Sequence, residues 1–150
     1  MTNAMSAINK SLIPISIFTV INMLYSFVVS YIFTVNWKDF VETFTIMNFV
    51  FFLQLTVFPI GIWHEKKFLL YRKTKDAKAK KLSVRSSIIL LVICFVLEAS
   101  GIFIAGFTTP KYYGPLLALL KMISVILALF GLLFSGLILH RELEKDLEEE

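Results

Sequence analysis

The sequence predicts an all-α integral membrane protein: a four-helix bundle of two transmembrane hairpins that are joined by a basic cytoplasmic loop. Three observations support this prediction. Of the 150 residues, 57% are hydrophobic, and the mean hydropathy of +0.78 is far above that of soluble domains. The apolar residues gather in four long runs. Between the second and third runs lies the most basic segment of the chain, HEKKFLLYRKTKDAKAKKLSVR.

Each apolar run is long enough to cross a bilayer. We expect transmembrane helices over residues 12–35, 41–63, 86–107 and 113–139. At 1.5 Å per residue these runs reach roughly 33 to 39 Å, which is sufficient to span with some tilt. The first run is too long for the core of a secretory signal peptide, so we expect it to be retained. Pro59 lies near the far end of the second run, where we expect a kink rather than a stop.

The distribution of basic residues predicts the orientation of the helices. The loop at 64–85 carries nine of the fifteen lysines and arginines: Lys66, Lys67, Arg72, Lys73, Lys75, Lys78, Lys80, Lys81 and Arg85. If this loop is cytoplasmic, twelve basic residues face the cytoplasm and two face outward, a strong positive-inside bias. We therefore expect one multi-pass transmembrane domain over residues 1–150, with both termini cytoplasmic. The aromatic side chains expected at the interfaces are Trp37, Tyr112 and Tyr113 outside, and Trp63 and Tyr71 inside.

The last residues, 140–150, form an acidic tail. They follow Leu139 and read HRELEKDLEEE, with Leu143 and Leu147 continuing a spacing of four. This spacing predicts that the fourth helix continues for about two turns into the cytoplasm with a narrow apolar stripe. Because the tail and the basic loop have opposite charges on one side of the membrane, they could pair with each other or each bind a partner.

Two charged residues, Glu98 and Lys121, lie inside the predicted third and fourth helices. They are roughly 13 and 11 Å from the outer helix ends, so we expect an intramembrane ion pair between them. Small residues on the same faces favour close helix packing: Gly101, Ala105, Ser124, Ala128, Gly131 and Ser135. Three roles for the pair remain open, namely fixing helix register, contacting a partner subunit, or carrying a proton or ion.

Intramembrane polar residues form a second set. Asn48 falls near the level of Glu98, and Asn22 and Gln54 share a deeper level. We expect these three side chains to form hydrogen bonds between helices; the alternative is that they line a polar translocation path. His64 and His140 both fall at the inner interface, but no third ligand follows at a fixed spacing, so we expect no metal site and no cofactor.

No catalytic motif is present in the sequence, which contains no Walker loop, GxSxG, HExxH or GxGxxG, so we do not expect an enzyme. The basic loop would contact anionic lipid headgroups or an acidic protein. Nucleic acid is not expected, because aromatic residues are not interleaved with the lysines.

The function predicted is that of a small polytopic protein that anchors, inhibits or assembles a partner, as a regulatory or accessory subunit. It would act through the basic loop, the acidic tail and the intramembrane polar residues. One alternative is a small oligomeric transporter or channel that uses Glu98 and Lys121. Another is a membrane immunity or accessory protein. The partner would be cytoplasmic or membrane-embedded, and a homo-oligomer is compatible with each hypothesis.

Overall fold

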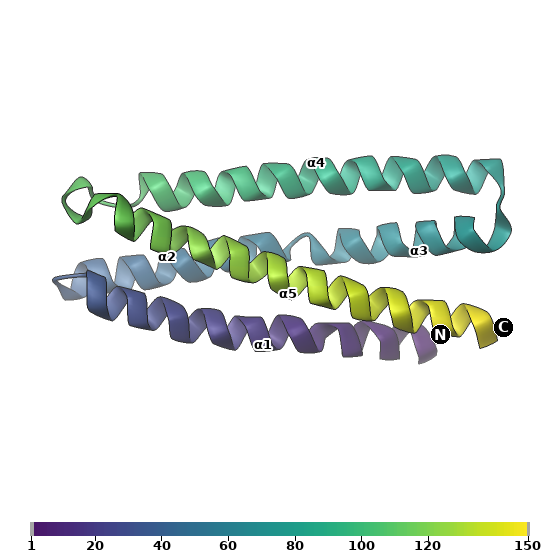
Figure 1. Ribbon diagram of the computed structural model, residues 1–150, viewed down its shortest axis with the longest axis horizontal. Coiled ribbons are helices and arrows are strands. Elements are labelled where there is room, and N and C mark those ends of the chain that lie inside the picture. Colours follow the sequence, from purple (N-terminus) through teal and green to yellow (C-terminus); the bar gives the residue numbers. More distant parts are fainter. Residues whose placement is uncertain (1, 150) are drawn as a thin grey trace.

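A computed structural model describes residues 2–149, which are almost entirely helical (Figure 1). Its elements are α1 (Thr2–Phe33), α2 (Trp37–Leu55), α3 (Phe58–Thr74), α4 (Ala77–Phe107), the short 3-10 helix η1 (Lys111–Tyr113) and α5 (Gly114–Glu149). No strand occurs among these residues. The all-α prediction is confirmed.

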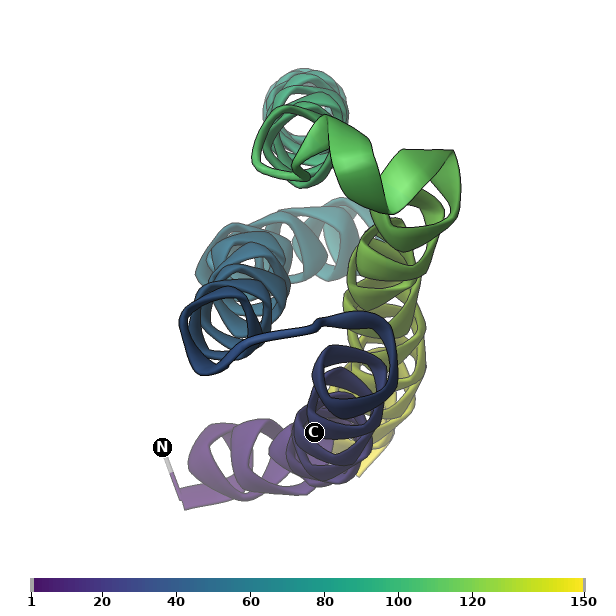
Figure 2. The same cartoon turned by 90° about the vertical axis from the view of Figure 1, so that its left-hand side faces the viewer.

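The helices form four antiparallel columns, in which α2 and α3 share one column (Figure 1). All four columns are long and apolar enough to cross a membrane. Both chain ends and the α3–α4 turn lie at one end of the bundle, which we call the terminal end. The α1–α2 and α4–α5 connections lie at the other, the connection end. Viewed along the bundle in Figure 2, α5 packs most extensively on α1, whereas α4 lies on α2, α3 and α5.

The second column is interrupted just before Pro59. Proline has no amide hydrogen and therefore cannot continue the regular bonding pattern of a helix. The amides of Thr56 and Val57 bond instead to the carbonyls of Leu53 and Gln54, each at 3.3 Å. The regular helical hydrogen bonds resume at Gly61, whose amide donates to the carbonyl of Val57 at 2.9 Å. The column therefore continues past Pro59 in α3 and is not terminated by it.

The basic segment 64–85, which joins the second and third apolar runs and whose composition favours helix, is almost entirely helical. α3 runs to Thr74, Lys75 takes the left-handed conformation (φ 51°) that ends it, and α4 begins at Ala77. The physical reason is that lysine, arginine, alanine and leucine are all good helix formers in water. Hydropathy decreases where a helix leaves the membrane, but the helix itself continues.

The other ends of the chain also extend beyond the apolar runs. α1 begins at Thr2, ten residues before the predicted start, and α5 continues to Glu149, as the leucine spacing predicted. Ala7, Leu69, Leu139 and Leu143 form a buried cluster that joins these extensions to α3 at the terminal end.

Candidate functional site

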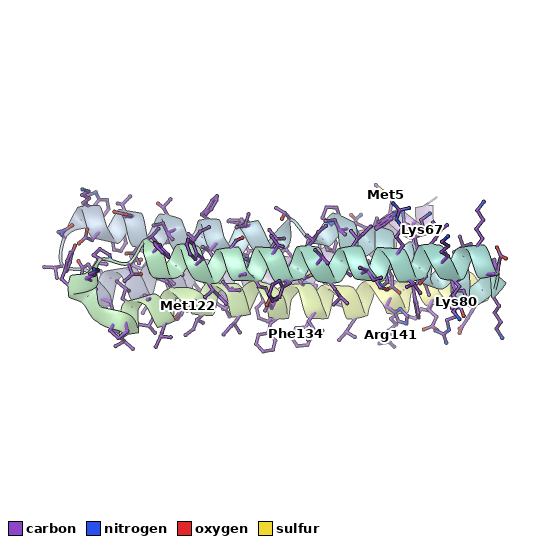
Figure 3. The ribbon with its side chains drawn as sticks, turned by 90° about the horizontal axis from the view of Figure 1, so that it is seen from above. Met5, Lys67, Lys80, Met122, Phe134 and Arg141 are labelled. Atoms are coloured by element: carbon purple, nitrogen blue, oxygen red, sulfur yellow. The ribbon has the colours of Figure 1, made fainter. Side chains whose placement is uncertain are left out.

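The α3–α4 turn presents a basic surface, which we define as the nine lysines and arginines between residues 66 and 85. On the first turns of α4, Ala79, Ser83 and Ser86 are buried, whereas Lys78 and Lys81 are exposed. Figure 3 shows Lys67, Lys80 and Arg141 at this same end of the bundle. Within residues 2–149, seven of these side chains make no hydrogen bond or ion pair: Lys66, Lys67, Lys75, Lys78, Lys80, Lys81 and Arg85.

The acidic tail is engaged by the rest of the protein. Glu142 accepts a hydrogen bond from Lys10 of α1 at 2.6 Å and another from Lys145 at 3.2 Å. Glu144 pairs with Arg72 of α3. Of the two alternatives left open for the tail, pairing within the chain is therefore realised at these residues, and most of the basic surface is left uncompensated.

The two histidines also lie at the terminal end of the bundle. His64 Nδ1 is 2.8 Å from Ser86 Oγ, and His140 pairs with Glu65 and lies 3.7 Å from Glu144. Over the described part of the chain, no three His, Cys, Asp or Glu side chains are grouped so as to hold a metal ion.

Lys121 and Glu98 do not form the ion pair that their depths led us to expect. Lys121 is only 1% exposed, and its ammonium group donates a hydrogen bond to Thr108 Oγ1 at 2.9 Å. Glu98 is half-buried at the boundary between α4 and α5 and has no hydrogen-bond or ion-pair partner within residues 2–149. Depth fixes the level of a side chain but not the direction in which it points, and here one charge points inward and the other outward.

The small residues predicted to pack are all buried: Gly101, Ala105, Ser124, Ala128, Gly131 and Ser135. Gly101 permits the closest approach. A Cβ atom there would lie 2.7 Å from Gln54 Nε2 and 3.0 Å from Val125 Cγ2. α4 therefore packs against α2 and α5 at this level with no space for a side chain.

The hydrogen bonds of the polar residues in the first hairpin do not follow the predicted depths, which placed Asn22 level with Gln54. Asn22 Nδ2 donates to Asn48 Oδ1 at 3.2 Å, and Asn48 Nδ2 donates to Ser26 Oγ at 2.9 Å. Gln54 instead bonds across to the Leu97 carbonyl of α4 at 2.8 Å. Four buried polar atoms lack a partner among the described residues: Asn22 Oδ1, Ser30 Oγ, Ser124 Oγ and Ser135 Oγ.

Asp39 forms a hydrogen-bonded clamp at the connection end that sequence reasoning missed. Its Oδ2 atom accepts hydrogen bonds from Tyr112 and Tyr113, both at 2.6 Å, and from Asn36 at 3.1 Å. The hydroxyl oxygen of Tyr113 also accepts a hydrogen bond from the amide of Val35 at 3.0 Å. These bonds join the two connections across more than 70 residues of sequence, and no local spacing signals them.

An apolar groove runs along the boundary of α4 and α5. One hollow of about 480 Å³ is lined by Glu98, Ile102 and residues of α5, and a second of about 500 Å³ continues toward the terminal end. Leu129 lines both hollows, so they adjoin along α5, and we call the two together the α4–α5 groove. The second hollow is also lined by Phe58, Gly61 and Ile62 of α3. Cys94 lines the second hollow one helical turn from Glu98.

Comparison of the chain with protein-family models, with curated proteins and with solved structures finds no match, so its function is inferred from its own geometry.

Proposed function

We propose that this chain is a non-enzymatic, multi-pass membrane protein that anchors or regulates an acidic protein partner through its basic surface. Both termini and the α3–α4 turn would be cytoplasmic, as the positive-inside bias predicts. The observation that supports this proposal best is that Lys78, Lys80 and Lys81 are exposed and unpaired among the described residues, although an acidic tail lies at the same end. That tail is already paired with Lys10 and Arg72.

The length of the helical extension favours a protein partner over lipid headgroups. Trp63 marks the expected inner interface, and Lys75 follows it by twelve residues, roughly 18 Å along the helix. The headgroup layer is only about 5 to 8 Å thick on each side of the hydrocarbon core. Lys66, Lys67 and Arg85 would therefore lie among headgroups. Lysines nearer the turn would reach beyond them, where a protein can contact them.

The experiment uses this difference in depth. Replacing Lys75, Lys78 and Lys81 with glutamine should abolish photo-cross-linking of a cytoplasmic protein to a probe placed at Lys80 in native membranes. The matched variant replaces Lys66, Lys67 and Arg85 and should retain the adduct. Membrane orientation must be mapped in both variants, because removal of basic residues can reverse topology. Adducts to lipid alone, or a protein adduct unchanged by the first variant, would contradict the proposal.

A small transporter is the second candidate, supported by the polar interior. Lys121 is buried and bonded to Thr108, and the four buried polar atoms named above lack partners among the described residues. Glu98 points away from this interior into the groove, so a transport path would use Lys121 rather than both charges. Proton or cation flux in vesicles that is abolished by Lys121→Met, but not by Glu98→Gln, would support this candidate.

A further inference from the structure

The α4–α5 groove is lined mostly by apolar side chains and runs beside the most exposed of the long helices. On α4 its lining residues Leu90, Cys94, Glu98 and Ile102 recur every four residues, which aligns them in a stripe that turns slowly around the helix over roughly 18 Å. α4 is also the least covered of the four long helices, with 11% of its most apolar window buried, compared with 33% for α5. The exposed face of α4 thus borders a groove that is left open by residues 2–149.

Glu98 is the chemically distinctive member of this groove. The other residues lining its hollow are apolar, and no donor within residues 2–149 bonds to its carboxyl group. A carboxyl group at this depth of the hydrocarbon is costly unless a donor or a cation meets it. The required group must therefore come from outside the chain.

We propose that the groove binds one transmembrane helix of a partner protein, and that this helix carries a basic side chain at the level of Glu98. A lipid acyl chain offers no donor to the carboxyl group. A second copy of this chain offers no cation either, because Lys121 is its one deeply placed intramembrane basic residue and is 1% exposed. Gly136 leaves the floor of the groove open, since a Cβ atom there would meet nothing within 4 Å. A helix backbone can therefore approach α5 closely.

This inference extends the proposed partner binding into the membrane, and it can fail separately. The probes are synthetic transmembrane peptides of leucine and alanine, one with a central arginine and one with leucine at that position. Energy transfer from a donor on the protein to an acceptor on the peptide is measured in phosphatidylcholine vesicles. The peptides carry no acidic cytoplasmic segment, so the variant without Lys75, Lys78 and Lys81 should bind them as the wild type does.

The wild type should associate with the arginine peptide at least tenfold more tightly than with the leucine peptide. Glu98→Leu should remove that difference, and Glu98→Gln, which conserves shape, should reduce it in a protein of wild-type fold. The matched control, Glu98→Leu with Val96→Glu, moves the carboxyl group about 200° around the helix to a position that is 54% exposed. It should not restore binding. Gly136→Leu, which fills the groove, should weaken binding of the arginine peptide without changing any charge.

Three outcomes would overturn the proposal. Equal binding of the two peptides would show that the groove accepts any apolar occupant, including lipid. Association restored by the relocated carboxyl group would show that charge anywhere on α4 is sufficient. Energy transfer between labelled copies of this chain that excludes the peptide would identify a second copy as the occupant.

Discussion

Replacing Gly101 with alanine tests how closely α4 approaches α2 and α5. The added methyl group would lie 2.7 Å from Gln54 Nε2 and 3.0 Å from Val125 Cγ2. Gln54 could move, but only by giving up its hydrogen bond to the Leu97 carbonyl. Overpacking costs about 1 to 3 kcal/mol and the lost bond about 1 kcal/mol, against about 1 kcal/mol gained by alanine over glycine in a helix. The expected net loss of unfolding free energy is therefore about 1 to 3 kcal/mol.

Gly136→Ala on α5 is the matched control. A methyl group there would meet nothing within 4 Å, so only the helix preference remains, and we expect a gain of about 0.5 to 1 kcal/mol. Both variants and the wild type would be unfolded in the same detergent micelles and followed by circular dichroism. The expected order of stability is Gly136→Ala, then wild type, then Gly101→Ala.

Equal stability of the two variants would refute the close contact at Gly101. Such a result would also weaken the docking proposal, because Glu98 lies three residues before Gly101 on α4. If α4 is not held against α2 and α5 at this level, the position of the Glu98 carboxyl group beside α5 has no structural support. The stability measurement therefore checks the geometry on which the docking proposal rests.

Two further variants test the remaining polar contacts. Replacing Tyr112 and Tyr113 with phenylalanine removes both hydroxyl donors to Asp39, so spin labels on the two connections should show a broader distance distribution; an unchanged distribution would mean that the clamp does not hold them together. Replacing Lys121 with methionine removes a buried amine whose one hydrogen bond among residues 2–149 is to Thr108, and it should raise the unfolding free energy by about 1 to 3 kcal/mol, measured by thermal unfolding. A loss of stability would show instead that the hydrogen bond outweighs the cost of burying the amine.

The long helices were predictable from hydropathy, and their ends were not. Each predicted apolar run lies within a helical column except for a few terminal residues. Hydropathy reports contact with lipid, which is expected to end near Trp63, whereas the helix ends at Thr74 because Lys75 leaves the helical conformation. The segment that joins them is polar, but its lysines, alanines and leucines favour helix, so the helix continues after the hydropathy has decreased.

The partners of charged residues could be predicted only in part. Glu98 and Lys121 were correctly recognised as charged residues inside apolar helices, but rotation about each helix axis decided their contacts. Lys121 faces Thr108 at the end of α4, a residue with no charge to signal the pairing. The contacts of Asp39 depend on how two connections meet in space, and a single sequence carries no local pattern for that.

The orientation of these charges has a consequence for function. Lys121 lies inside the bundle against a hydroxyl group, where a partner protein cannot reach it. Glu98 lies at the surface of the bundle, and so do the exposed lysines of the α3–α4 turn. Because an uncompensated charge costs most in lipid and least in water, Glu98 in the proposed orientation would depend more strongly on an external group than any lysine of the turn would. A partner that satisfies both surfaces would be a membrane protein with a basic transmembrane helix and an acidic cytoplasmic segment. Its helix would determine the affinity and its acidic segment the rate of association.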